Sequence, residues 1–249
     1  MSYKYGKRIA ADGLVFYVDA ANNSSYNGSI GGNAWADLVG DHDGSLVNMQ
    51  TNPYDSGYIY DSGNGGSIEF DGSNEYAGFS SSAALVPGSD DYSIMFWAKY
   101  NGPALTSSSI IEGVFQKGVY YQTGGELQIT FRGGSLNGIY FRLRDSSSIS
   151  QVAPSTDISS TIGDGSFHHY ACIIDRSSNE LKLYFDGSLA GTTSGINPSS
   201  IDTTQQLRIG RYETFYGNVQ LSNLSIYNDK ALSASEVLHN YNTLKDRFI

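Results

Sequence analysis

Three carboxylic acids in the stretch E-F-D-G-S-N-E-Y, which runs from Glu69 to Tyr76, are the residues best placed to do chemistry. Side chains at positions i and i+2 of an extended strand project from the same face, so Glu69 and Asp71 would lie side by side. Retaining glycosidases work with two carboxyl groups about 5 to 5.5 Å apart across the glycosidic bond. The stretch therefore raises hydrolysis of a sugar polymer as one hypothesis.

The residues between Asp71 and Glu75 argue against that hypothesis. Positions 72 to 74 hold Gly, Ser and Asn, and these turn formers would break the extended backbone on which paired acids depend. Glu75 is then expected beyond a bend, so its side chain need not point where that of Glu69 points. Hydrolysis accordingly ranks last among the functions considered.

Other reactive centres find less support. His168 and His169 are neighbours in a predicted strand and so face opposite ways, which prevents both from binding one metal ion. Cys172 stands among apolar residues, which is typical of a buried thiol. The sequence has no G-x-S-x-G nucleophile motif, no phosphate-binding glycine loop followed by lysine and no Cys/His metal spacing.

Binding of a sugar needs an aromatic platform beside polar groups, because a sugar ring presents C–H groups on its faces and hydroxyls at its rim. Two segments combine these residue types, and the richer one lies in a predicted hairpin tip. The predicted ligand-binding residues are Tyr120, Tyr121, Arg211, Tyr212, Phe215, Tyr216 and Asn218. Two alternatives stay open: the same residues would serve as ordinary strand residues or as anchors of a protein interface.

Composition limits the partners. The chain has 249 residues, with Asp+Glu 25 against Lys+Arg 15 and a formal net charge of -10, which argues against nucleic acid as a partner. The N-terminus lacks the apolar core of a secretory signal peptide, and no stretch approaches about 18 consecutive apolar residues. We therefore expect synthesis in a cytoplasm and no membrane insertion.

The chain is predicted to be all-β. Short apolar or alternating windows, rich in β-branched and aromatic residues, are separated by Gly, Asn and Asp clusters that favour tight turns. The predicted strands are 14–18, 67–70, 92–99, 119–122, 127–131, 139–143, 167–174, 181–185, 207–212 and 219–227. Residues 94–98 are apolar at every position, so we expect this strand to lie between two sheets or under a covering loop.

The two ends of the chain differ from the rest. Ser233 and Glu236 form a capping-box pattern, and Val237, Leu238, Tyr241, Leu244 and Phe248 follow at roughly helical spacing, which predicts a short C-terminal helix that docks on the sheets. Residues 1–11 are expected to form an arm that either frays or docks on a partner. Residues 12–249 are expected to form one domain.

The order of several motifs resembles a known family. These motifs include D-G-L-V-F-Y-V-D-A-A-N, G-S-I-E-F-D-G-S-N-E-Y, Y-S-I-M-F-W-A-K, L-K-L-Y-F-D-G-S-L-A-G-T-T and a final A-L-S-A-S-E-V-L-H-N-Y-N. Together they resemble a laminin-G-like domain of the concanavalin A-like lectin and glucanase superfamily over about residues 12 to 248. The resemblance implies a jelly-roll β-sandwich of two antiparallel sheets and a role in glycan binding, protein adhesion or attachment to particles.

The first and last of these motifs are similar to those of tailed-phage virion proteins. This similarity implies a non-enzymatic virion component, a capsid decoration or a tail or fibre protein, that contacts other virion proteins, binds host-surface glycans and assembles as a symmetric homo-oligomer. A free carbohydrate-binding lectin is the alternative. The glucanase branch carries E-x-D-x-x-E, or the same pattern with one residue inserted, whereas lectin-like members carry F-D-G-x-x-D/E-Y without hydrolysing sugars.

Calcium is the one cofactor that the resemblance implies, since such domains often bind it through loop carboxylates. The acidic residues nearest to one another in sequence are Asp37, Asp41 and Asp43, and these are the predicted metal ligands. Asp71 and Asn74 are a second candidate pair. Solvated acidic loops with no metal are the alternative interpretation.

Overall fold

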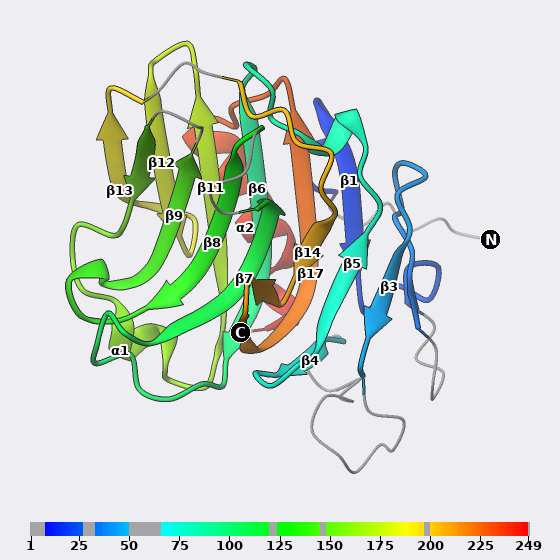
Figure 1. Cartoon of the computed structure of the whole chain (residues 1–249), viewed down its shortest axis with the longest axis horizontal. Coiled ribbons are helices and arrows are strands. Elements are labelled where there is room, and N and C mark those ends of the chain that lie inside the picture. Colours follow the sequence, from blue (N-terminus) through cyan, green and yellow to red (C-terminus); the bar gives the residue numbers. More distant parts are fainter. Residues whose placement is uncertain are drawn as a thin grey trace.

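The computed structural model describes residues 8–26, 33–49, 66–119, 124–144, 148–196 and 200–248. Within these residues, the strands form two large antiparallel sheets and one small two-stranded sheet. Figure 1 shows the two large sheets packed face to face. The prediction of an all-β sandwich is confirmed.

The sheet nearer the viewer in Figure 1, here called the front sheet, has eight strands within the described residues. Its strands are, in spatial order, β10 (Ile149–Val152), β9 (Gly138–Arg144), β8 (Glu126–Arg132), β7 (Ile111–Gly118), β14 (Leu207–Ile209), β5 (Tyr76–Phe79), β3 (Gly44–Val47) and β2 (Ala34–Trp35). All neighbours in this order run antiparallel.

The other sheet, here called the back sheet, has seven strands within the described residues. Its order is β1 (Leu14–Asp19), β17 (Asn218–Asn228), β6 (Tyr92–Tyr100), β11 (Phe167–Asp175), β12 (Glu180–Phe185) and β13 (Ser188–Ser194), and β4 (Ile68–Asp71) also pairs with β17. Among the described residues, short turns of 3-10 helix, η2 (Ala83–Leu85), η3 (Gly134–Leu136) and η4 (Lys245–Arg247), and the four-residue helix α1 (Ser159–Ile162) lie in the connections and at the C-terminal end.

The core fills the space between the two sheets because alternate residues of each strand point inward. Phe96, Tyr170 and Phe131 form one run of ring contacts across it, with centroids 4.9 Å and 5.4 Å apart. Cys172 is fully buried in the same core, and burial raises the pKa of its thiol well above the ordinary value. The prediction of a buried thiol is therefore confirmed.

The outer side of the back sheet is covered by a helix, not by a second sheet or a loop. Helix α2 (Ala234–Leu244) begins at the predicted capping box, in which Ser233 accepts from the amide of Glu236 and the Glu236 carboxylate accepts from the amide of Ser233. Trp97 stacks on Tyr241 at 5.5 Å and on Phe248 at 4.5 Å. This cover explains why residues 94–98 are apolar on both faces.

The prediction that Leu238 belongs to the docked face of the helix is wrong, since its side chain is 46% exposed.

The described part of the N-terminal arm lies on the same helix: the amide of Ala10 donates to Asn240 Oδ1 at 2.7 Å, and the Tyr227 hydroxyl donates to the carbonyl of Ala10 at 3.0 Å. No helix among the described residues is long and apolar enough to cross a membrane.

Two predicted strands differ from the structure. The window 207–212 is broken at Gly210 into β14 and the short strand β15 (Arg211–Tyr212), which pairs with β16 (Phe215–Tyr216). The window 119–122 lies almost wholly outside the described residues, and the strand found just before it is β7.

Candidate ligand-binding site

A two-stranded hairpin, residues 211–216, lies against the outward side of the front sheet. Gly210 has φ +82, a left-handed conformation that favours glycine, and this bend turns the chain out of β14. The hairpin then contacts β7, where a Cβ atom on Gly113 would lie only 2.2 Å from the amide nitrogen of Tyr212. The glycine at position 113 therefore allows the hairpin backbone to approach the strand closely.

Gln116 of β7 fixes the tip of the hairpin. Its Nε2 donates to Glu213 Oε1 at 2.6 Å, and its Oε1 accepts from the amide of Glu213 at 3.0 Å and from Arg208 at 3.2 Å. Glu213 itself has φ +51, so the tip needs support from side-chain hydrogen bonds. Gln116 is fully buried, and it is therefore a positioning residue for the hairpin.

One side of the hairpin carries an arginine on two tyrosine rings. The Arg211 guanidinium lies 5.0 Å from the ring centroids of both Tyr76 and Tyr216, and its Nε donates to the carbonyl of Glu213 at 2.6 Å. The two rings are 6.5 Å apart. Cation–π contacts of this kind restrain the guanidinium while its terminal N–H groups stay available.

The other side joins the hairpin to β8 and β9. Tyr212 stacks on Phe215 at 6.1 Å, and Arg142 donates both to the Tyr212 hydroxyl at 2.9 Å and to Glu126 Oε1 at 2.7 Å. Burial raises the pKa of Tyr212 to about 12, so the hydroxyl stays protonated. Burial also raises the pKa of Glu126, and the Arg142 guanidinium opposes that shift.

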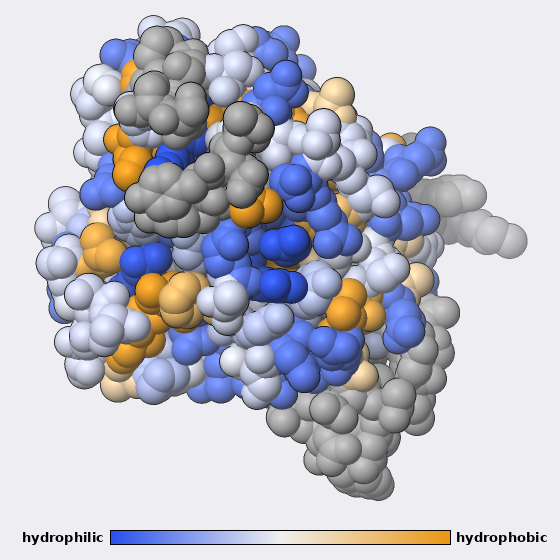
Figure 2. Space-filling model, in the orientation of Figure 1, coloured by the Kyte–Doolittle hydropathy of each residue, from blue (hydrophilic) through white to orange (hydrophobic). Residues whose placement is uncertain are grey.

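The hairpin surface thus combines an exposed ring with fixed polar groups. Phe215 is 39% exposed, whereas Tyr212 beneath it is buried. Figure 2 shows hydrophilic residues gathered over the β7–β14 part of the front sheet. A planar apolar face flanked by hydrogen-bond donors is the arrangement that a sugar ring needs.

The predicted ligand-binding residues lie partly in this surface. Arg211, Tyr212, Phe215 and Tyr216 form the hairpin, and Asn218 begins β17 next to it, with its amide donating to Glu112 Oε2 at 2.8 Å. Tyr120 and Tyr121 lie outside the described residues. Five further residues of the hairpin surface were not predicted from the sequence, because they come from strands far apart in the chain: Tyr76, Gln116, Glu126, Arg142 and Arg208. The sequence signal that could have indicated some of them is the alternation of polar and apolar residues along β8 and β9.

The acidic stretch is built as a turn. Glu69 and Asp71 lie on β4 of the back sheet, and alternate residues Ile68 and Phe70 point into the core. Glu75 is fully buried, and its Oε2 accepts from the amide of Asp71 at 2.9 Å. Its carboxylate therefore closes the turn and does not face a cleft beside Glu69, as the turn residues between them predicted.

The histidines face opposite sides of β11, as predicted. His168 binds Asp186 Oδ2 at 2.8 Å and Asp164 Oδ1 at 3.3 Å, and these bonds outweigh burial and raise its pKa. His169 packs between Trp97 and Tyr241 under α2, where burial lowers its pKa to about 3.

The predicted metal ligands Asp37, Asp41 and Asp43 lie in one loop, in which carboxylate oxygens of Asp37 and Asp43 accept hydrogen bonds from backbone amides. Asp37 Oδ1 accepts from the amides of Tyr17 and Val39, its Oδ2 accepts from Gly40, and Asp43 Oδ1 accepts from the amide of Asp37. Among the described residues, no three acidic, histidine or cysteine side chains are grouped as metal ligands. Asp37 therefore orders its own loop, and calcium binding by Asp37, Asp41 and Asp43 stays a prediction.

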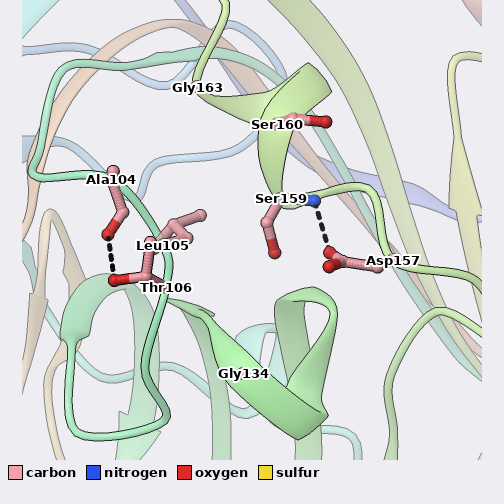
Figure 3. A pocket seen from close by; sticks show the side chains of 8 residues that line it. All are labelled: Ala104, Leu105, Thr106, Gly134, Asp157, Ser159, Ser160 and Gly163. Carbon is pink, nitrogen blue, oxygen red and sulfur yellow. Dashed lines mark hydrogen bonds between the residues drawn. The ribbon is translucent and has the colours of Figure 1, made fainter.

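Two hollows that are lined by described residues lie away from the hairpin. The first, about 470 Å³, is drawn in Figure 3 and is lined by Ala104, Leu105, Thr106, Gly134, Asp157, Ser159, Ser160 and Gly163. Its one carboxylate, Asp157, accepts from the amide of Ser159 at 2.9 Å and so is already engaged at the start of α1. The second, about 660 Å³, lies between the N-terminal segment, β1 and the end of α2. The lining of the first has no aromatic ring, and that of the second has one, Tyr17, whose hydroxyl donates to Asp19 Oδ2 at 3.0 Å.

Comparisons with known proteins agree on the fold. A laminin G family model, described as the concanavalin A-like lectin/glucanases superfamily, matches residues 70–238. Among curated proteins, no sequence matches this chain.

Solved structures match over nearly the whole chain. The binding domain of Paraclostridial Mosquitocidal Protein 1 matches with a TM-score of 0.67 and 17% identity, over 92% of this chain and 52% of that chain. The binding domain of botulinum neurotoxin DC in complex with SialylT matches with a TM-score of 0.66 and 15% identity, over 94% and 52%. The same toxin domain in complex with rat synaptotagmin II gives a TM-score of 0.66 and 15% identity, over 93% and 52%. This chain spans about half the length of these solved chains, and at such identities the likeness carries the fold alone.

Proposed function

This chain belongs to the concanavalin A-like lectin/glucanases superfamily, and from that membership and the hairpin geometry we propose that it is a non-enzymatic glycan-binding module. The observation that carries the proposal is the hairpin surface, where the exposed Phe215 ring stacks on Tyr212 on one side and Arg211 packs on Tyr216 on the other. A sugar ring stacks on such a platform while its hydroxyls bind the neighbouring polar groups.

The absence of catalysis is part of the proposal. It is supported by the acidic stretch, because Glu75 is buried against the Asp71 amide and leaves no acid triplet open to substrate. Incubation with β-glucans tests this point. The proposal predicts no release of reducing ends, and release that disappears in Glu69→Gln would establish a hydrolase.

The toxin domains give indirect support for glycan recognition. One binding domain is described in complex with SialylT, and the cell entry of botulinum neurotoxin type C is described as dependent upon interaction with two ganglioside molecules. The second solved chain matches the fold with a TM-score of 0.65 and 16% identity, over 93% of this chain and 51% of that chain. Those descriptions apply to chains about twice as long as the matched part, so the hairpin surface and not the likeness is the main support.

A glycan array with a matched pair of variants tests the binding function. Phe215 is 39% exposed and Leu189 on β13 is 56% exposed, so either can be shortened to alanine without emptying the core. We expect the wild-type chain and Leu189→Ala to bind the same glycans at micromolar concentration, and Phe215→Ala to lose most of that binding. Equal binding by all three chains would show that the glycan-binding site does not include Phe215 of the hairpin.

We further propose that the module is carried by a phage-like particle as a symmetric homo-oligomer. The support is the pair of terminal motifs that resemble virion proteins. These motifs meet in the fold, because Leu14 and Ala231 both pack against the apolar cluster under α2. The hairpin lies on the opposite sheet, so attachment through the back of the molecule would leave it exposed. Electron microscopy of purified particles with a labelled antibody tests this role, and particles without label would contradict it.

A further inference from the structure

The outward side of the front sheet concentrates arginine in a chain whose net charge is -10. In β8, Leu127, Ile129 and Phe131 belong to the core, so the residues between them point outward. The same alternation holds in β9 and β14. It places Arg132, Arg142, Arg144 and Arg208 on this side, and Arg211 of the hairpin lies over it. These five residues are called the arginine face below.

The described carboxylates of this face do not neutralise its charge. Glu126 is bonded to Arg142 at 2.7 Å, and Glu213 is held by Gln116 at 2.6 Å. Among the described residues, three arginines of the face bind only neutral partners: Arg132 donates to Thr130, Arg208 to Gln116 and Arg211 to the carbonyl of Glu213. Within the part of the chain that the structure describes, three guanidinium charges therefore have no carboxylate partner.

Aromatic rings hold two of these guanidinium groups in place. Arg132 lies 5.2 Å from the ring centroid of Tyr140, and Arg211 lies 5.0 Å from those of Tyr76 and Tyr216. Contact through the flat face of a guanidinium leaves its in-plane N–H groups for a ligand. Less rotamer entropy is lost on binding, and a restrained planar fork matches the two oxygens of a carboxylate or sulfate group.

A buried amide lies beneath the arginine face. Gln128 pairs with Gln116 on one neighbouring strand and with Arg142 on the other, and both of these partners bind the hairpin. Its side chain is fully buried, and neither its nitrogen nor its oxygen has a hydrogen-bond partner among the described residues. Such groups are rare in folded proteins and are usually completed by water or a ligand.

We propose that the arginine face binds glycans that carry carboxylate or sulfate groups. This proposal rests on the proposed glycan-binding function and narrows it to acidic sugars. Arg208 and Arg211 contact one anionic group, and Phe215 contacts a sugar ring. Arg132 lies two strands from β14, on β8, and contacts a further unit of the glycan, while Arg142 supports Tyr212 from below. Duplex DNA is a different anion that lacks an exposed sugar face, and the overall negative charge of the chain opposes it.

Paired ligands test the proposal. Binding of the folded chain is measured to sialyllactose and lactose for the carboxylate arm, and to heparin and chemically desulfated heparin for the sulfate arm. We expect the acidic member of at least one pair to bind at least about tenfold more tightly, and that difference to shrink as salt is added.

Arginine variants locate the site. Arg208→Gln and Arg211→Gln are each expected to weaken acidic-glycan binding about tenfold, and Arg211→Lys, which keeps the charge but loses the planar fork, to weaken it less. Arg8→Gln removes one charge from an exposed residue next to α2 and is expected to bind like the wild type. Circular dichroism of each variant checks that the fold is kept.

The outcomes separate the two claims. Equal binding of acidic and neutral sugars, with both weakened by Phe215→Ala, would overturn the acidic specificity and leave the glycan-binding function standing. Binding of no sugar in either pair would overturn both. Duplex DNA bound as tightly as heparin, or Arg8→Gln as harmful as Arg208→Gln, would show attraction by charge alone and overturn the site.

Discussion

At the scale of single residues, two buried glutamines on adjacent strands lie on the hairpin side of the front sheet and differ in the number of hydrogen bonds that their side chains make. Gln116 makes three hydrogen bonds, to Glu213 and Arg208, whereas Gln128 makes none within the described residues. Both are fully buried. Because an unpartnered buried amide costs stability and a bonded one contributes it, equal substitutions at the two sites have unequal effects.

We predict that Gln116→Leu lowers the free energy of unfolding by about 1 to 3 kcal/mol, because the amide of Glu213 and the arginine lose their partner. Gln128→Leu is expected to be neutral or stabilising. Urea denaturation of both variants measures the difference. Equal destabilisation would mean that Gln128 has a bound partner in solution, such as an ordered water.

Lys117 gives a pH-dependent prediction. It is fully buried, it donates to Ser81 and to the carbonyl of Gln205, and burial lowers its pKa to about 8. Between that value and its ordinary pKa of 10.5, the unfolded chain holds the proton and the folded chain releases it. Folding is therefore favoured as pH rises through this window, by up to about 1.4 kcal/mol per pH unit.

The comparison with Lys117→Met isolates that effect from the tyrosines, which also titrate in alkali. The stability of the wild type minus that of the variant should increase from pH 8 towards pH 10.5. A difference that stays flat across this range would show that Lys117 keeps its ordinary pKa in the folded protein.

At the scale of elements, the hairpin and β7 meet through glycine. A Cβ atom on Gly113 would lie 2.2 Å from the amide nitrogen of Tyr212 and 2.6 Å from the carbonyl of Phe215. We predict that Gly113→Ala displaces the hairpin and weakens glycan binding at least about tenfold, because backbone atoms cannot yield as a flexible side chain does.

Gly163→Ala is the matched control, since its Cβ would have only one neighbour, the carbonyl of Ser159 at 3.4 Å. Both variants are compared by glycan titration and by thermal unfolding. Normal binding by Gly113→Ala would show that the position of the hairpin does not set the affinity.

Helix α2 is the element that closes the back sheet, and its capping box is separable from the hairpin. Ser233→Ala removes the cap and is expected to lower the free energy of unfolding by about 1 kcal/mol, with glycan binding unchanged. Ser235→Ala keeps the cap in the same exposed turn and serves as control. Urea denaturation followed by tryptophan fluorescence is the measurement, since Trp97 stacks on this helix. A loss of binding in Ser233→Ala would contradict the separation of the two faces.

The elements that sequence patterns predicted are those whose pattern is local. The capping box at Ser233 and the alternating strand at 181–185 depend on neighbours in the chain, and both are found. Strand β7 reads I-E-G-V-F-Q-K-G, in which a bulge near Val114 and the buried Gln116 and Lys117 interrupt the apolar alternation. The break at Gly210 depends on the Phe70 ring, because a Cβ atom at position 210 would lie within 3.0 Å of that ring. Phe70 is far from Gly210 in the sequence, so this contact leaves no pattern in the residues around position 210.

At the scale of the whole molecule, the two sheets have different roles in the proposed function. The back sheet is sealed by α2 and by the segment around Ala10, and it holds the motifs from both ends of the chain. The front sheet presents the hairpin and the arginine face. The candidate site was predicted in part, because Phe215 and its neighbours are adjacent in sequence, whereas Tyr76, Arg132 and Arg142 reach it only through strand order.

The most direct test of a binding surface on the front sheet is an NMR titration of the isotope-labelled chain with sialyllactose. We predict that the amide shifts that change lie in residues 208–218 and in the facing parts of β7, β8 and β9, and that the sugar is recovered intact. Shifts confined to β4 around Glu69 and Asp71, or hydrolysis of the sugar during the titration, would contradict the account.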